Sequence, residues 1–341
     1  MRILKYIFLL LILFSLAFIV FVATQPGDYK IIRSKEIAIS KDILFNFVSD
    51  SSALKDWNPW IENQAIFKNE NLTSNDTLSQ QIIINDKVIK SFFQFKKTKI
   101  GTLVTWKIEG KMNFEEKILN TLQGGVQNII GNKLVDGLKN IDQYLVKEIA
   151  TYDIKIEGLV TKHATNYIQQ IDTCSIVDFQ KESKRLLQNM MSFVEKNEII
   201  ITGLPFITFK TWLKNDKNII FAMCVPVEEE ILTTDGSEIS GGRFEEFLAV
   251  KTNLKGDYSH KQKAWDKTYS YIREKNLVEE INGTKIEVYK ISLPKERKPS
   301  KWVTEIYIPI QKKVYRPKVI KPVVNEEIIT PIENPTSNTI E

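Results

Sequence analysis

Two similar strand-like segments, separated by eighty-three positions, constrain the fold of this chain more than any other feature. One extends from Ile219 to Val227 and the other from Trp302 to Ile310, and each ends in a β-branched residue, a proline and a second β-branched residue. A segment with helical apolar spacing precedes each of them. We therefore predict two β-α-β-β units in tandem, because a repeat of this size is one supersecondary unit that packs against its copy.

The sequence around the two strands supports the same interpretation. Ser175 with Asp178, and Ser259 with Gln262, resemble capping boxes at helix starts. We expect a strand before each helix, at residues 152–159 and 247–254, and an extended stretch after it. The positions with helical spacing are Phe179, Leu186, Leu187, Met190 and Val194 in the first helix and Ala264, Trp265, Thr268, Tyr271 and Ile272 in the second.

The second repeated strand carries a carboxylate, Glu305, where the first has Ala222. Strand alternation places Glu305 on one face with Val303, Tyr307 and Pro309, while residues 304, 306, 308 and 310 point the other way. Burial of an unpaired charge is costly. Glu305 is therefore expected to face a cleft or to have a charged partner.

Four short segments of the second unit resemble the GyrI-like family, the effector-binding domain of bacterial transcription activators. They are Lys255–Tyr258, Ala264–Asp266, Ile286–Tyr289 and Thr304–Ile310. The resemblance covers about residues 152–311 and implies a pseudo-twofold α+β domain whose cleft binds small, often lipophilic molecules. It also implies that Glu305, on the last strand, contacts the ligand, and some relatives are hydrolases that use this glutamate. The chain departs from the family pattern at Asp257-Tyr258 and at residues 290–294, so one cleft wall is expected to differ.

Four aromatic residues are candidates to line this cleft with Glu305. They are Trp265, Tyr269, Tyr289 and Tyr307. An aromatic cleft with one carboxylate suits a lipophilic cation, through cation–π contacts and charge pairing. The alternative is that these aromatic side chains only pack the two halves of the domain together. In a partly dry cleft the pKa of Glu305 would be raised, which would allow it to act as a general base.

The N-terminus contains eighteen uncharged residues, from Tyr6 to Ala23, preceded by Arg2 and Lys5. This length suits a membrane span of about 17–25 residues better than the roughly 7–15-residue apolar region of a secretory signal. Residues 21–25 contain no small-x-small cleavage site. We predict an uncleaved anchor over residues 1–24, with the N-terminus in the cytoplasm and the soluble domains on the extracytoplasmic side.

Residues 29–148 are predicted to form a separate domain. A strand at 33–39 and a helix at 40–48 precede strands at 79–84, 88–95 and 102–109 and a long closing helix at 112–146. This helix-grip plan, with the segments Trp57–Trp60 and Gly137–Ile141, resembles the START-like polyketide-cyclase (SRPBCC) superfamily. The resemblance implies an apolar cavity between the long helix and the sheet. Trp57, Trp60 and Trp106 are candidates to line it or to pack the core.

Several kinds of site are not expected. The two histidines, His163 and His260, lack partners at metal-ligand spacing, and no glycine-rich phosphate loop is present. We therefore predict neither a metal nor a cofactor. The net charge of +5 is spread along the chain without a basic stripe, so nucleic acid is not an expected partner. Cys174 and Cys224 are either free thiols or a single bridge.

The predicted fold class is α+β: a transmembrane helix, a START-like domain, a tandem β-α-β-β domain and a disordered tail at 312–341. We predict a membrane-anchored sensor or sequestering protein for small hydrophobic molecules, including cationic ones, in preference to an enzyme. One alternative is a hydrolase in which Glu305 activates water with Tyr307 or Tyr269. Another is a protein–protein interaction module. A hydrolase requires a second polar group near Glu305, and the sequence offers only tyrosines.

Overall fold

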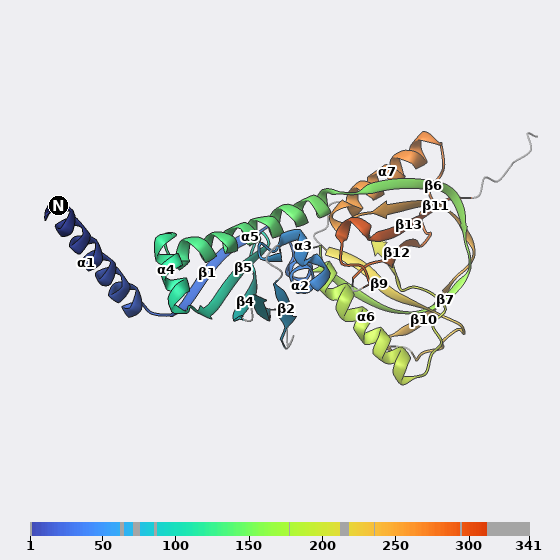
Figure 1. The fold of residues 1–341 in the computed structure, drawn as a ribbon. Helices are drawn as coiled ribbons and strands as arrows, with labels where there is room; N and C mark the ends of the chain where they lie inside the picture. Colours follow the sequence, from blue (N-terminus) through green and yellow to red (C-terminus); the bar gives the residue numbers. More distant parts are fainter. Residues whose placement is uncertain are drawn as a thin grey trace, which may run out of the picture.

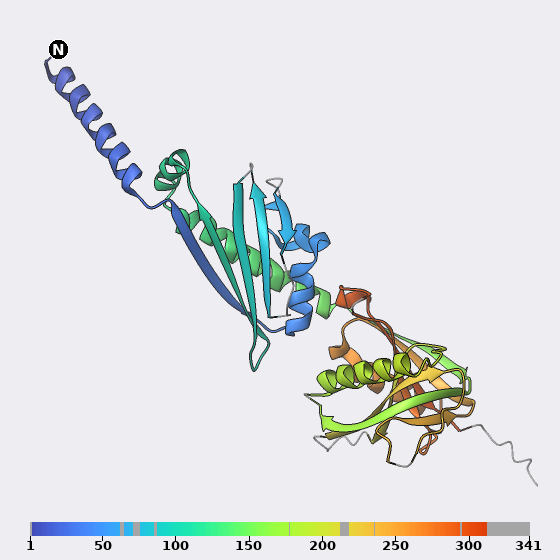
Figure 2. The same ribbon diagram turned by 90° about the horizontal axis from the view of Figure 1, so that it is seen from below.

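The computed structural model describes residues 2–61, 65–70, 76–84, 87–176, 178–211, 218–234, 236–293 and 295–311. A single N-terminal helix, α1 (Arg2–Thr24), precedes two α+β parts, each built on one antiparallel sheet (Figures 1 and 2). Residues Ile3–Thr24 are long and apolar enough to cross a membrane. The tail predicted at 312–341 lies outside the described residues.

The first sheet has the strand order β1-β5-β4-β3-β2. Its strands are β1 (Asp28–Ile37), β2 (Ile66–Asn69), β3 (Thr77–Ile84), β4 (Lys87–Lys97) and β5 (Thr102–Lys111). Three helices, α2 (Lys41–Ser49), α3 (Leu54–Trp57) and α5 (Val126–Ala150), pack their apolar sides into one core on the same face of this sheet. The predicted strands and the first helix are present. The short strand β2 was not predicted.

Three tryptophans form the centre of this first core. Trp57 and Trp60 both meet Trp106 edge to face, with ring centroids 5.5 and 5.4 Å apart. Helix α5 crosses directly over the cluster at Gly137, where a Cβ atom would lie only 2.5 Å from Cζ3 of Trp106. These rings therefore occupy the layer in which the START-like resemblance implies a ligand cavity.

The closing helix differs from the prediction, which placed one helix over residues 112–146. The structure has two helices, α4 (Phe114–Leu122) and α5, joined by Gly124 and Gly125. Both glycines have positive φ, 88° and 94°. Because such angles are favourable mainly for glycine, the Gly-Gly pair ends the first helix and turns the chain.

The second sheet contains eight strands in the order β10-β7-β9-β8-β12-β13-β11-β6. They are β6 (Asp153–Lys162), β7 (Thr165–Ser175), β8 (Phe206–Thr211), β9 (Asn218–Val227), β10 (Ser240–Phe244), β11 (Phe247–Lys255), β12 (Lys285–Ile291) and β13 (Val303–Pro309). Helix α6 (Phe179–Lys196) joins β7 to β8, and α7 (Lys261–Glu274) joins β11 to β12. The two units thus occupy the two halves of one sheet and meet where β8 pairs with β12.

The strand predicted at 152–159 is present as β6, but it does not directly precede α6 as predicted. The strand that precedes α6 is β7, whereas the predicted segment 152–159 belongs to β6. Strand β6 pairs with β11 at the far edge of the second half, with Leu159 opposite Val250. Only residues 163 and 164 separate β6 from β7, but the two strands belong to different halves of the sheet. Strand β6 pairs with β11 of the second unit, whereas β7 pairs with β9 of the first.

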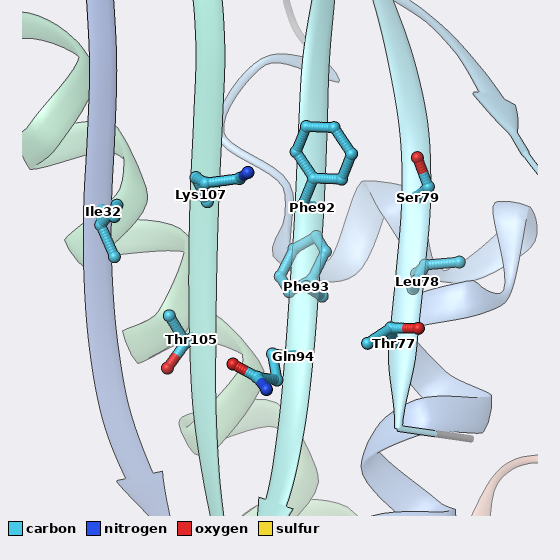
Figure 3. Close-up of a pocket in the computed structure, with 9 residues that line it drawn as sticks. All are labelled: Ile32, Thr77, Leu78, Ser79, Phe92, Phe93, Gln94, Thr105 and Lys107. Atoms are coloured by element: carbon cyan, nitrogen blue, oxygen red, sulfur yellow. The ribbon is translucent and has the colours of Figure 1, made fainter. Parts of the chain in front are cut away.

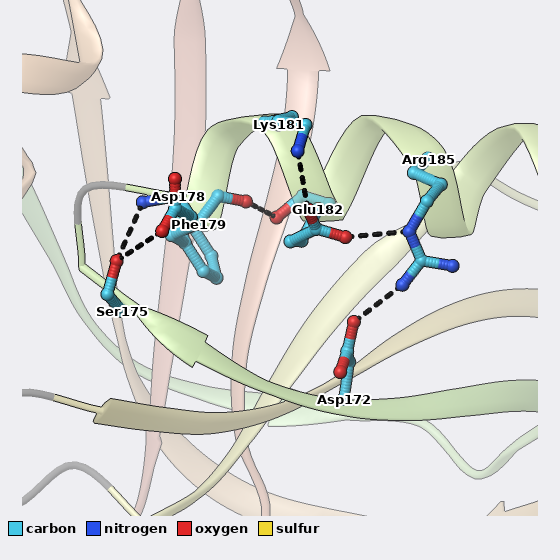
Figure 4. Close-up of polar contacts among 8 residues, drawn as sticks. Asp172, Ser175, Asp178, Phe179, Lys181, Glu182 and Arg185 are labelled. Atoms are coloured by element: carbon cyan, nitrogen blue, oxygen red, sulfur yellow. Dashed lines mark hydrogen bonds and ion pairs between the residues drawn. The ribbon is translucent and has the colours of Figure 1, made fainter.

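The predicted serine capping arrangement fits the start of α6 better than it fits the start of α7. Ser175 Oγ donates to Asp178 Oδ2 (2.7 Å) and accepts from the Asp178 backbone N–H (3.1 Å), and the helix begins at the next residue (Figure 4). Arg185 joins Glu182 of the helix to Asp172 of β7, which fixes the helix to its sheet (Figure 4).

The start of α7 is capped differently from the prediction, which gave Ser259 this role. The Asp257 side chain accepts from the Ser259 backbone N–H at 2.9 Å. A single 3-10 turn, η3 (Tyr258–His260), follows before the α-helix begins at Lys261. Asp257 therefore caps the 3-10 turn, and α7 itself begins after His260 without a side-chain cap.

The second sheet has two differently packed faces. On the first, which we call the helix-bearing face, α6 and α7 pack onto alternate residues of the strands, among them Ile306 and Ile308. On the opposite face a smaller apolar cluster forms. Its buried members are Phe206, Ala222, Cys224, Phe244, Ala249, Ile286, Val288 and Tyr307. Cys174 and Cys224 are not joined in a disulfide, and only Cys224 is buried.

The two parts of the chain are joined by Trp302, which precedes β13. Its indole is 1% exposed and belongs to the core of the first part, although its neighbours in sequence belong to the second. Tyr258 lies against this indole, with ring centroids 4.8 Å apart. Further polar contacts join Arg297 to Asp50, Ser300 to Glu148, and His260 to the carbonyl of Ile149.

Candidate ligand-binding site

The five predicted site residues do not gather in one cleft. Trp265 and Tyr269 on α7 and Tyr289 on β12 pack with the helix-bearing face of the second sheet. Tyr307 belongs to the opposite face, and Glu305 lies beside it. The sheet itself therefore separates the two groups, and no single ligand on one face contacts all five side chains.

The Glu305 carboxylate already pairs with lysine side chains and does not await a cationic ligand. Its carboxylate accepts from Tyr307 Oη (2.8 Å) and pairs with Lys251 (3.0 Å) and Lys290 (3.3 Å). A third ammonium group, that of Lys162, lies 5.0 Å from the centroid of the Tyr307 ring. The predicted proximity of Glu305 and Tyr307 is confirmed, because strand alternation places them on the same face.

The electrostatics of Glu305 differ from the prediction. Burial raises the pKa of this carboxyl, but hydrogen bonds from Lys251 and Tyr307 and the charge of Lys251 outweigh it, so the net pKa is lowered. The raised pKa that would suit a general base is therefore wrong. For Tyr307, burial and the adjacent carboxylate both raise the pKa of the phenol.

A second carboxylate, Glu287, is wholly buried at 0% exposure on the helix-bearing face. It accepts hydrogen bonds from Trp265 Nε1 (2.7 Å) and Tyr289 Oη (2.8 Å) and pairs with Lys261 Nζ (3.0 Å). We call these four residues the Glu287 cluster. A buried charge is tolerated only when it is paired and hydrogen-bonded, and each of these three donors meets that need.

Lys261 places its ammonium group among aromatic rings. Its Nζ lies 4.8 Å from the centroid of the Phe179 ring and 5.4 Å from that of Tyr289, and it also donates to Tyr289 Oη at 3.0 Å. Burial and the charge of Glu287 raise the pKa of Tyr289 well above its usual value, so this phenol remains a donor. Since Phe179 lies on α6, the lysine contacts both halves of the domain.

Trp265 also lines a pocket of about 530 Å³ on the helix-bearing face, which we call the Trp265 pocket. Its lining residues are Phe209, Gln262, Trp265, Asp266, Tyr269, Ser270, Arg273 and Lys285. The Trp265 and Tyr269 rings lie 6.1 Å apart at 31°, while Phe209 meets Trp265 edge-on at 6.0 Å and 86°. Three aromatic rings therefore form the apolar part of the pocket.

The polar groups of the pocket are mostly bonded to one another. Asp266 accepts from Gln262 at 3.0 Å, and Arg273 donates to Ser270 at 3.0 Å. The remaining cation, that of Lys285, pairs with Glu279 at 2.7 Å. The pocket lining carries one negative charge, on Asp266, and two positive charges, on Arg273 and Lys285. Glu279, which neutralises Lys285, lies outside the lining, so both the aromatic rings and the polar groups shape what this pocket can bind.

Glu287 was not among the predicted site residues, although the sequence contains a signal for it. Glu287 and Tyr289 are two positions apart on one strand, so alternation places them on the same face. The same alternation places Glu305 beside Tyr307 on β13. The contact with Trp265 could not be predicted, because it depends on how α7 docks on the sheet.

Another pocket, of about 480 Å³, lies on the first sheet. Figure 3 shows its residues on strands β1, β5, β4 and β3, with the helices behind the sheet. Its rim includes the exposed Ile32 and the Phe92 ring, over which Lys107 Nζ lies at 4.1 Å. This pocket is therefore on the face away from α5, not in the layer where a START-like cavity was expected.

Residues 174–311 match the family model described as a GyrI-like small-molecule-binding domain. This part of the chain is therefore a GyrI-like domain, as the four sequence segments indicated. The match includes α6, α7, the Glu287 cluster and the Trp265 pocket.

Among solved structures, the chain is similar to the C-terminal domain of EcmrR, with 16% identity and a TM-score of 0.41 over 47% of this chain and 98% of the other. SAV2435 bound to tetraphenylphosphonium is 12% identical, with a TM-score of 0.33 over 46% and 94%. A hydrolase from Listeria innocua is 12% identical, with a TM-score of 0.32 over 50% and 97%. No curated protein matched the chain.

Proposed function

We propose that this chain is a membrane-anchored sensor or sequestering protein for small hydrophobic molecules, neutral or cationic, which bind in the Trp265 pocket. Trp265 and Tyr269 supply the surfaces that contact the ligand, and Tyr289 acts indirectly through Glu287. The GyrI-like match supports small-molecule binding, and α1 supports the anchor. The strand order, in which two units meet at β8 and β12, supports a pseudo-twofold domain.

One observation carries the proposal: the indole of Trp265 is hydrogen-bonded to a buried carboxylate and, although only 4% exposed, forms part of the pocket wall. The bond from Nε1 to Glu287 holds the ring in a single orientation. A preformed aromatic wall loses little conformational entropy when a ligand stacks on it, and this favours affinity. The Glu287 cluster thus serves the pocket as a support rather than as a direct ligand contact.

The face on which Glu305 lies is less suited to a cationic ligand. Lys251 and Lys290 already pair with this carboxylate, and Lys162 adds a third positive charge nearby. A cation would have to displace two lysines and approach a third. We therefore propose that Glu305 and Tyr307 do not contact the ligand of the Trp265 pocket.

The hydrolase alternative is weakened by the same contacts. A carboxyl with a lowered pKa is a poorer general base near neutral pH than one with a raised pKa. The groups that converge on Glu305 are two ammonium groups and a phenol, all of which donate to it. We propose a structural role for Glu305.

The first part of the chain is proposed to be a START-like module that carries the GyrI-like domain away from the membrane. Its single sheet, covered on one face by α5, supports this assignment. We propose that the N-terminus is cytoplasmic and that both modules lie on the extracytoplasmic side. The contacts made by Trp302 hold the two modules together.

The test compares two ions of matched shape and opposite charge, tetraphenylphosphonium and tetraphenylborate, by titration calorimetry of the full chain in nanodiscs. Empty nanodiscs provide the partitioning background. Trp265→Ala is expected to weaken binding of the cation about tenfold, because an aromatic contact contributes about 0.5–1.5 kcal/mol beyond area burial. Phe92→Ala, in the other pocket, is the control and should bind like the parent.

Two results would count against the proposal. Equal binding by the parent and Trp265→Ala would place the ligand elsewhere. Loss of binding in Phe92→Ala alone would place it on the first sheet. Preference for tetraphenylborate over the phosphonium would leave the pocket in place but show that Arg273 and Lys285 decide its charge selectivity.

A further inference from the structure

Helix α4 is amphipathic but packs against the protein with its polar side. None of its side chains is buried. Its apolar residues lie outward: Phe114 is 44% exposed, Leu119 56% and Leu122 69%. Positions 114, 118 and 122 follow one another at helical spacing, so with Leu119 they form an apolar stripe, which the exposed Glu115 interrupts in the first turn. A surface helix of a soluble protein normally has the reverse orientation.

The polar side of α4 holds the helix in place. Asn113 and Glu116 form a reciprocal capping box, with bonds of 2.8 and 2.9 Å. Glu116 also pairs with Lys87 of β4, and Lys117 Nζ donates to the carbonyl of Gln25. These contacts fix the rotation of α4 about its own axis, so they hold the apolar stripe outward.

The position of α4 indicates what covers this stripe. The Met112 N–H, just before α4, donates to the carbonyl of Gly27 at 2.9 Å. Only residues 25–27 separate the end of α1 from the start of β1. In both views α4 lies at the end of the first part that faces α1 (Figures 1 and 2). If α1 spans a bilayer, α4 lies at the surface of that same bilayer.

We propose that α4 is an interfacial membrane helix whose apolar stripe inserts between the lipids around α1. This inference rests on the proposed anchoring by α1. A nine-residue helix is about 13.5 Å long, and an interfacial helix typically lies about 5–10 Å into the boundary between headgroups and acyl chains. Lys111, exposed at the end of β5, is placed to meet the headgroups.

Insertion of α4 gives the protein a second point of attachment to the membrane, in addition to α1. A single span joined to a domain by three residues leaves the domain free to tilt and rotate. A second contact through α4 defines the direction of the first sheet relative to the membrane. Since Trp302 joins the two parts, it also limits the orientations available to the Trp265 pocket.

The test uses the full chain in liposomes that contain lipids brominated either near the headgroup or deep in the acyl chain. Leu122→Trp introduces a fluorophore at the most exposed position of the stripe, and Leu119→Trp repeats the measurement one turn away. The control is Val135→Trp, which replaces an exposed valine on α5 of the same domain. Emission added by each substitution is obtained by subtracting the parent.

Bromine quenches only over short distances, so tryptophans of the soluble domains stay bright. The expected result is strong loss of the added emission in both α4 variants, larger with bromine near the headgroup, and no loss in Val135→Trp. Unquenched emission in the α4 variants while the chain floats with the liposomes overturns the inference but leaves the anchor. Shielding from iodide without bromine quenching shows a protein partner on α4 and also overturns it. A chain that does not float refutes both proposals.

Discussion

The Glu287 cluster yields the most demanding prediction, which concerns the substitution Glu287→Gln. Glutamine preserves the volume and one acceptor, so the bond from Trp265 Nε1 can remain. It removes the negative charge that pairs with Lys261, whose side chain is only 14% exposed. Breaking a buried ion pair from one side costs about 3–5 kcal/mol, because the remaining charge is left uncompensated. We expect a loss of that size in local stability.

The double substitution Lys261→Met with Glu287→Gln separates charge from packing. Replacing both partners of a buried pair by neutral groups of similar volume is often close to neutral. The double variant is therefore expected to recover most of the loss, so the two substitutions should be strongly non-additive, as is usual for residues in contact. A loss that persisted in the double variant would mean that the carboxylate is required for packing and not for charge pairing.

The assay is hydrogen exchange by mass spectrometry on peptides from β12 and α7, which reports the free energy of local opening. The control is Glu279→Gln, which breaks the more exposed pair with Lys285 and should cost no more than about 1 kcal/mol. If Glu287→Gln loses no more than this control, our reasoning about the buried cluster is refuted.

Three further predictions follow from other contacts. The pKa of Glu305 is lowered from its usual 4.5, so its contribution to stability is complete above that pH and is lost as the pH falls through the folded value. Glu305→Gln should therefore flatten the stability profile below about pH 5 in urea titrations. Trp302→Ala should destabilise the first part by about 3–5 kcal/mol and split a single thermal transition into two in calorimetry. Gly137→Ala should cost about 1–3 kcal/mol, measured by urea unfolding, because the new methyl group meets Trp106.

Much of the second domain could be predicted from local patterns. The repeated strands, the helical spacing before them and the proximity of Glu305 and Tyr307 all depend on neighbours within a few residues. Strand β7 was missed because Gln169, Gln170 and Asp172 make it look polar, whereas residues 152–159 alternate clearly. Which of these strands pairs with which half depends on contacts about ninety residues apart, and no local pattern contains them.

The candidate site was harder to predict than the fold. Choosing Trp265 and Tyr269 required only that they lie on one side of α7. Placing them with Glu305 required the side of the sheet on which α7 docks, and the sequence of the helix does not determine that choice. In the first domain, the tryptophans were correctly assigned to a possible core, but the break at Gly124 was overlooked because apolar spacing continues across it.

The position of Trp302 also has a consequence for synthesis on the ribosome. The other buried members of the first core lie between Ile31 and Leu145, so they leave the ribosome long before this indole does. At about 5–20 residues per second, the site it fills stays open for roughly ten to thirty seconds. A nascent chain in that interval exposes the apolar surface that Trp302 later covers, and a chain truncated before residue 302 lacks the side chain that completes the first core.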